Sequence, residues 1–92
     1  MIEIDKIWLR AWVLRKLFTH KFIGGRHTNF GNIPKGAPKH QWHFIKEVAK
    51  ELVKEGFLLT KRTSYGLEVS INPRIIAECL SIIKKFYLDF EV

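Results

Sequence analysis

Apolar residues recur at helical spacing near the start of the chain. Five residues form the main stripe: Ile7, Ala11, Leu14, Phe18 and Phe22. Their spacing predicts a helix over residues 5–22, with Asp5 as a potential N-cap and with Gly24 and Gly25 ending it. Further apolar residues lie on both sides of the stripe: Trp8, Leu9, Trp12, Val13 and Leu17. Because the helix is apolar around most of its circumference, we expect it to pack on two elements, or on one element and a second copy.

Residues 23–37 lack such a pattern and are predicted to form a connector. Four glycines and two prolines fall between Gly24 and Pro38. Residues 26–28 are expected to form a short edge strand. Asn32-Ile33-Pro34 predicts one turn of helix, because it has the order of a cap followed by a first-turn proline. The glycines do not indicate a phosphate loop, since the Walker spacing and its Lys-Ser/Thr ending are absent.

A second long helix is predicted over residues 38–55, from Pro38 to Gly56 in the C′ position. Its core stripe consists of Ile45, Val48, Ala49 and Leu52. At 100° per residue, five polar side chains fall within about 80° of one another on the opposite side. They are Lys39, His43, Lys46, Lys50 and Lys54. Such a face is typical of solvated helices and equally of a helix that lies along a phosphate backbone.

Residues 57–71 alternate in the manner of a hairpin. We expect Phe57 and Leu59 to face the core from the first strand, and Glu68 and Ser70 to face outward from the second. The turn is placed at residues 63–66, because Gly66 can adopt the positive φ that such turns need. Asn72-Pro73 then predicts the start of a last helix over residues 73–88.

This order of elements predicts an α+β fold that is mainly α, in a single domain of residues 1–92. A chain of 92 residues builds one core, and 47% hydrophobic residues are more than a disordered chain carries. Cys79 is the only cysteine, so an internal disulfide is excluded and a reducing compartment is favoured. No signal peptide or membrane span is apparent. We therefore expect a cytoplasmic protein, and the composition, rich in Lys, Glu and Ile, favours a thermophilic source.

The charge is unevenly distributed. The net charge is +7, and residues 6–46 contain nine Lys or Arg residues and no Asp or Glu. All four histidines lie in the same stretch: His20, His27, His40 and His43. Such a field favours a polyanionic partner, either nucleic acid or an anionic surface.

The sequence offers little for catalysis, metals or cofactors. A metal site built from His27, His40, His43 and Cys79 is disfavoured, because zinc needs four ligands at compact spacing and no second close pair exists. Cys79 belongs to the apolar stripe of the last helix, where cysteines are inert. We expect no enzyme activity and no cofactor.

The segment KELVKEGFL (residues 50–58), followed by a basic turn and a returning strand, resembles the winged helix-turn-helix superfamily. The connector and TSYGLEVSINP (residues 63–73) are similar to small archaeal winged-helix proteins of unassigned function. The resemblance is closest over residues 38–73 and elsewhere rests on element order. It implies a double-stranded DNA-binding protein, a transcriptional regulator, with residues 38–55 as the recognition helix and 57–71 as the wing.

The resemblance also implies the contact residues. In the recognition helix they are Lys39, His40, Gln41, His43, Lys46 and Lys50. On the wing they are Lys61, Arg62 and Tyr65, and backbone contacts from the connector are Arg26 and Lys35. Phosphate contacts of this kind position a protein without reading sequence.

Two alternatives remain open. A winged-helix domain can serve as a protein-interaction module without DNA, and fold alone does not decide between the two. An RNA or single-strand binder could use Trp42 and Tyr65 as stacking platforms, although Trp42 lies at the edge of the core stripe. The apolar first and last helices could also form a homodimer, which would place two recognition helices for a two-part DNA site.

Overall fold

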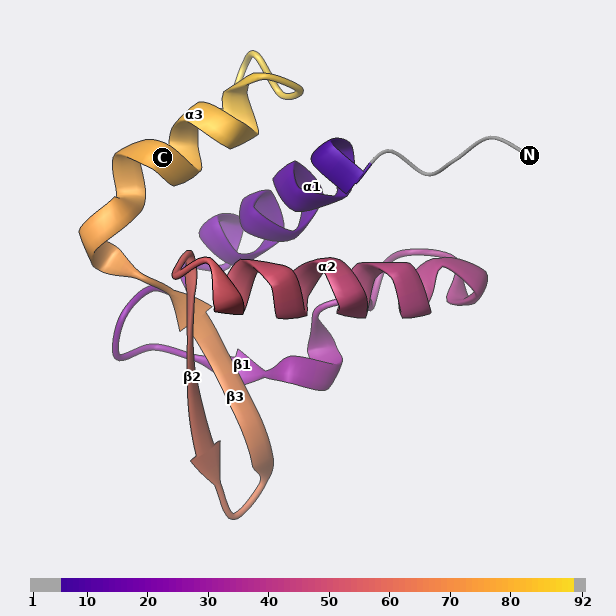
Figure 1. Ribbon diagram of the computed structural model, residues 1–92, viewed down its shortest axis with the longest axis vertical. Coiled ribbons are helices and arrows are strands. Elements are labelled where there is room, and N and C mark those ends of the chain that lie inside the picture. Colours follow the sequence, from indigo (N-terminus) through magenta and orange to yellow (C-terminus); the bar gives the residue numbers. More distant parts are fainter. Residues whose placement is uncertain (1–5, 91–92) are drawn as a thin grey trace.

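The computed structural model describes residues 6–90. Three α-helices lie at one end of the molecule, and a hairpin projects away from them (Figure 1). The elements, in chain order, are α1 (Lys6–Thr19), β1 (Thr28–Asn29), η1 (Phe30–Asn32), η2 (Lys39–Gln41), α2 (Trp42–Lys54), β2 (Leu58–Thr63), β3 (Gly66–Ile71), η3 (Pro73–Ile75) and α3 (Ile76–Lys84), where η marks a 3-10 helix. The expected α+β class, mainly helical, is confirmed for these residues. No helix among them has the length and apolar run needed to cross a bilayer.

α1 ends three residues earlier than predicted, and no glycine ends it. The amide of Phe22 donates to the Leu17 carbonyl at 2.9 Å, and the amide of Lys21 donates to the Phe18 carbonyl at 2.9 Å. These two bonds form a Schellman motif, and Lys21 takes the left-handed position with φ 60°. Gly24 and Gly25 instead belong to the segment that runs beside β3, where the Gly24 amide donates to the Ile71 carbonyl at 2.9 Å. The proposed N-cap, Asp5, lies outside the described residues.

The connector folds around the side chain of Lys16. The Lys16 ammonium donates to the carbonyls of Asn32 at 2.8 Å and Ile33 at 2.9 Å, and also to that of Lys35. The expected helical turn is present but shifted, because η1 begins after Asn29, whose side chain accepts from the Gly31 amide. The expected edge strand is present as β1, which begins two residues and ends one residue later than predicted. The fold of this segment therefore depends on a residue from α1.

The sheet has three antiparallel strands in the order β1-β3-β2. The turn falls at Ser64 and Tyr65, as predicted. The facing of β2 was predicted wrongly by one residue, since Leu58 is buried and Leu59 is exposed. Ser70 was expected to face solvent and is buried. The segment at Gly24 covers it, and the Ser70 hydroxyl donates a hydrogen bond to the Gly24 carbonyl at 2.8 Å.

One hydrophobic core joins the three helices to the sheet. α1 packs against α2, α3 and β3, so its two apolar sides are both used within the chain. The fully buried side chains include Leu14, Leu17, Ile33, Ile45, Leu52, Leu58, Ile71 and Ile83. The helix predicted over residues 38–55 is divided, because residues 39–41 form the 3-10 turn η2 and α2 follows.

The last helix is shorter than the predicted range of 73–88. Asn72 caps its start as expected, accepting from the Arg74 amide at 3.0 Å, but residues 73–75 form η3 and α3 ends at Lys84. Beyond it the chain turns back onto α1. The Arg15 guanidinium lies 4.5 Å from the Tyr87 ring centroid, and the Phe90 ring meets that of Phe18 edge-on at 6.2 Å. These aromatic contacts favour the turn over a longer helix.

Candidate nucleic-acid interface

The outward face of α2 carries a row of lysines. Lys50 and Lys54 are exposed and Lys46 is half-buried, all on the side opposite the core residues Ile45 and Leu52. Lys50 pairs with Glu47 at 3.3 Å, which places one carboxylate within the row. Within residues 6–90, Lys46 and Lys54 form no ion pair. Two of these ammonium groups are therefore not neutralised by a neighbouring acid.

The turn η2 presents the next candidate residues. Lys39 and His40 are exposed, and so is His43 in the first turn of α2. Gln41 is half-buried, on the core side that its angle predicts. The indole N–H of Trp42 donates to the Ala37 carbonyl at 2.8 Å and fastens the start of α2 to the connector. Since Trp42 is half-buried and held in this way, it is poorly placed to stack on a base.

The carboxylates on the flank of α2 hold it against α1. Arg10 donates twice to the Glu55 carboxylate, each time at 2.8 Å, and Lys6 pairs with Glu51 at 3.3 Å. The hydrogen bonds from Arg10 lower the pKa of Glu55, and the nearby positive charge acts in the same direction, while partial desolvation opposes both. These pairs join α1 to the flank of α2 beside its outward lysine row.

The tip of the hairpin projects into solvent. Tyr65 is 83% exposed. The Thr63 hydroxyl accepts from the Tyr65 amide at 3.1 Å and donates to the Gly66 carbonyl at 3.2 Å. The Asn29 side chain donates to the Tyr65 carbonyl at 2.9 Å, so the connector braces the same turn. The exposed phenol is thus held on a well-supported turn.

Lys61 and Arg62, both exposed, lie on opposite faces of the hairpin. Arg62 pairs in register with Leu67, and Lys61 pairs with Glu68. Directly paired residues share a face and neighbours in a strand alternate, so Arg62 lies on the Leu67 face and Lys61 on the Glu68 face. Leu67 lines the groove next to α2, so the two cations face different regions of the surface.

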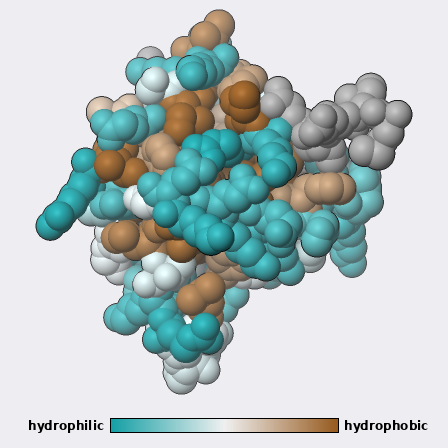
Figure 2. Space-filling view, viewed as in Figure 1, coloured by the Kyte–Doolittle hydropathy of each residue, from teal (hydrophilic) through white to brown (hydrophobic). Residues whose placement is uncertain are grey.

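A groove of about 600 Å³ separates α2 from the hairpin. Its apolar floor comes from Phe30 of η1, Val53 of α2 and Leu67 of β3. The remaining lining residues are Glu47, Lys50, Glu51, Lys54 and Thr60. Figure 2 shows the hydrophilic surface that runs along α2 in this region. The groove brings two cations of α2 beside the face of the hairpin that carries Arg62.

The two candidate residues of the connector lie apart from each other. Lys35 is exposed in the turn that precedes η2, close in the chain to Lys39. Arg26 lies over the Phe22 ring at 5.9 Å, and its neighbours Gly25 and His27 line a different hollow, of about 210 Å³, together with Lys61. The structure therefore groups Lys35 with α2, and Arg26 and Lys61 with the opposite face of the sheet.

That second hollow contains a paired histidine. His27 Nδ1 hydrogen-bonds to the Glu68 carboxylate, which ties the connector to the central strand. In the described residues, no group of three or more His, Cys, Asp or Glu side chains is arranged to hold a metal ion.

Burial raises the pKa of the Cys79 thiol to about 11, with a smaller contribution from Glu78. A neutral, buried thiol is a poor nucleophile.

Sequence reasoning missed the floor of the groove. Phe30 lies in the irregular connector, where no periodicity assigns it to a face, and Val53 does not belong to the predicted core stripe of its helix. The groove forms because Lys16 and Asn29 hold the connector beside α2 and the hairpin, and contacts this distant in sequence leave no local signal.

Compared with protein-family models, with curated proteins and with solved structures, the chain matches none.

Proposed function

We propose that the protein is a double-stranded DNA-binding protein with a winged helix-turn-helix arrangement, acting as a transcriptional regulator. In this proposal α2, preceded by η2, is the recognition helix and the β2–β3 hairpin is the wing. The observation that carries it is the groove between them, where exposed lysines of α2 face the side of the hairpin that bears Arg62. A basic helix beside a basic hairpin is the arrangement with which winged helices bind a duplex.

The recognition element divides into two parts. Lys39, His40 and His43 surround the N-terminal end of α2, the end that enters a major groove and approaches base edges. Lys46, Lys50 and Lys54 follow along its outward face and suit phosphates. Glu47 lies among them and can accept a hydrogen bond from the exocyclic amine of cytosine. Gln41, being half-buried, is the least accessible of the predicted base contacts.

The wing contributes unequally from its two faces. In this proposal Arg62 contacts the DNA strand that lies against α2. Tyr65 at the tip contacts the adjacent minor groove or the DNA backbone. Lys61 and Arg26 lie toward the other face of the sheet, so they contribute through the long-range field more than through direct contact. Lys35 adds a backbone contact beside η2.

The experiment is binding of a fluorescein-labelled random duplex, followed by anisotropy at several salt concentrations. Five neutralised phosphates would give a slope of log affinity against log salt of about −4.5, since each contributes about −0.9. We expect Lys50→Gln/Lys54→Gln to flatten this slope by about 2 and to weaken binding at low salt. The matched control is Lys84→Gln/Lys85→Gln, which removes two exposed lysines at the end of α3 and should leave the slope almost unchanged.

A second pair of variants tests the geometry of the wing. Arg62→Gln and Lys61→Gln remove one positive charge each from adjacent positions, so their long-range electrostatic effects are closely matched. The proposal predicts that Arg62→Gln weakens binding more than Lys61→Gln does. Equal effects would indicate that only net charge matters and would argue against a specific docked wing.

The alternatives predict different outcomes in the same assay. A protein-interaction module would show no measurable binding to the duplex at low salt, and that result would overturn the proposal. A single-strand or RNA binder would prefer an unpaired strand of the same length. Since the Trp42 indole is bonded to Ala37, such a protein would have Tyr65 as its exposed stacking residue, and Tyr65→Ala would abolish the preference.

A further inference from the structure

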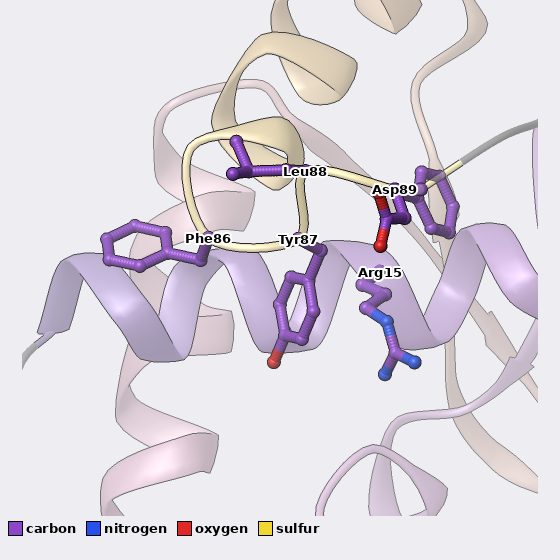
Figure 3. A pocket seen from close by; sticks show the side chains of 6 residues that line it. Arg15, Phe86, Tyr87, Leu88 and Asp89 are labelled. Carbon is purple, nitrogen blue, oxygen red and sulfur yellow. The ribbon is translucent and has the colours of Figure 1, made fainter.

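The end of the molecule opposite the hairpin carries an apolar surface, which we call the C-terminal surface. It is formed by Arg15 of α1 together with residues 86–90, and Trp8 lies on the same side of α1 as Arg15. A hollow of about 590 Å³ opens there, lined by Arg15, Phe86, Tyr87, Leu88, Asp89 and Phe90. Figure 3 shows the Tyr87 ring and the Arg15 side chain side by side, both crossing α1 in the same direction, while Leu88 points away from the helix.

Two large apolar side chains of this surface meet solvent, and so does Trp8 of α1. Leu88 is 83% exposed, Trp8 38% and Phe86 37%. Trp8 and Arg15 are seven residues apart, so they lie within about 20° of each other on α1 and roughly 10 Å apart along its axis. An exposed aliphatic side chain beside partly exposed aromatic rings is typical of a protein interface.

The charges of the C-terminal surface are of both signs. The exposed Arg15 guanidinium stacks over Tyr87 and forms no ion pair with any of residues 6–90. Asp89 is also exposed and likewise lacks an ion pair among them. A surface with one free cation and one free anion can pair with its own two-fold copy, because each cation then meets the other copy's anion.

We propose that the C-terminal surface binds a second copy of this chain in a two-fold symmetric dimer. Leu88 of each copy packs against Phe86, Tyr87 and Phe90 of the other, and Arg15 of each copy pairs with Asp89 of the other. The proposal goes beyond DNA binding and does not depend on it.

Charge and position favour a second copy as the occupant. The chain has a net charge of +7, so most faces of two copies repel each other. The C-terminal surface carries one cation, Arg15, and one anion, Asp89, and is balanced. The surface also lies at the end away from the hairpin (Figure 1), so a dimer formed there leaves the groove of each copy open.

Sedimentation velocity of the protein alone, over a wide range of concentration, tests the proposal. We expect the weight-average sedimentation coefficient to rise toward that of a dimer for the wild-type protein. Leu88→Ser should remain monomeric at every concentration. Leu59→Ser is the matched control, since it removes an exposed leucine from the hairpin, and it should associate like the wild type.

A charge-reversal pair identifies the contact itself. Arg15→Asp and Asp89→Arg each create like-charge contacts across the two-fold axis, so each variant alone should be monomeric. An equimolar mixture restores both opposite-charge pairs and should sediment as a heterodimer. A change within one chain could not be repaired by mixing. The proposal is overturned if the wild type stays monomeric at the highest concentration, or if the mixture associates no better than its components. Both outcomes are independent of nucleic-acid binding.

Discussion

At the scale of single residues, Lys21 and Gly56 occupy the same position at the ends of two helices. Each follows its helix in a Schellman motif, with φ of 60° at Lys21 and 87° at Gly56. Glycine adopts this conformation without a Cβ clash, whereas a side chain costs about 1–2 kcal/mol. The end of α1 is therefore held in a strained conformation that the end of α2 avoids.

Replacing Lys21 should raise stability. We expect Lys21→Gly to increase the free energy of unfolding by about 0.5–1 kcal/mol, because relief of the strain exceeds the added entropy of the unfolded chain. Gly56→Ala should lower it by about 1 kcal/mol for the opposite reason. Urea denaturation followed by circular dichroism measures both. A lower midpoint for Lys21→Gly would contradict the assigned backbone conformation.

The ion pair between Arg10 and Glu55 makes a definite prediction about acid. The pKa of Glu55 is lowered in the folded state, so its contribution to stability is present above the unfolded pKa and is lost as pH falls through the folded pKa. The difference in stability between wild type and Glu55→Gln should therefore be largest above the unfolded pKa of Glu55, at about pH 7, and should shrink as pH falls below it through the folded pKa. Denaturation midpoints across this range measure it. A difference independent of pH would exclude the ion pair as its cause.

At the scale of elements, the connector depends on Lys16 for its shape. Three carbonyls of residues 32–35 converge on one ammonium, whose pKa is lowered by burial and by Lys35. Lys16→Met keeps the length of the side chain and removes the donors. We expect it to lower the free energy of unfolding by about 1–3 kcal/mol. The control is Lys39→Met at an exposed position, for which a change within about 0.5 kcal/mol is expected. Equal effects in thermal or urea unfolding would refute the role given to Lys16.

Elements with local signals were predictable from the sequence. Asn72 before Pro73, Gly56 after α2 and Gly66 in the hairpin turn each specify backbone conformation through their own chemistry, and all three do so in the structure. The end of α1 was not predictable, because Lys21 carries no sign of a left-handed conformation. Leu58 and Leu59 are equally apolar, so the sequence could not say which one faces the core. The strand facing was decided by the packing of β2 against α2.

The candidate site was predictable only in part for the same reason. The angle between residues on a helix is fixed, so the lysine row of α2 followed from spacing alone. The opposite facing of Lys61 and Arg62 also follows from strand alternation, but which of them faces α2 depends on the register with β3. The apolar floor at Phe30 required the tertiary fold.

At the scale of the whole molecule, two surfaces lie at different ends. The groove with its lysines and Arg62 lies between α2 and the hairpin, and the C-terminal surface lies across α1 beyond α3 (Figure 1). A dimer formed through the second surface would carry two copies of the first, which suits a DNA site made of two halves. The proposed partners therefore do not compete for the same residues.

The central claim, that α2 and the hairpin bind duplex DNA, is tested most directly by nuclear magnetic resonance. Uniformly ¹⁵N-labelled protein is titrated with a short unlabelled duplex at low salt, and each backbone amide is followed. The proposal predicts that amide shifts concentrate in residues 39–54 and 60–67, while residues 76–90 change little. Absence of shifts at saturating duplex, or shifts centred on α3 and the C-terminal surface, would contradict it.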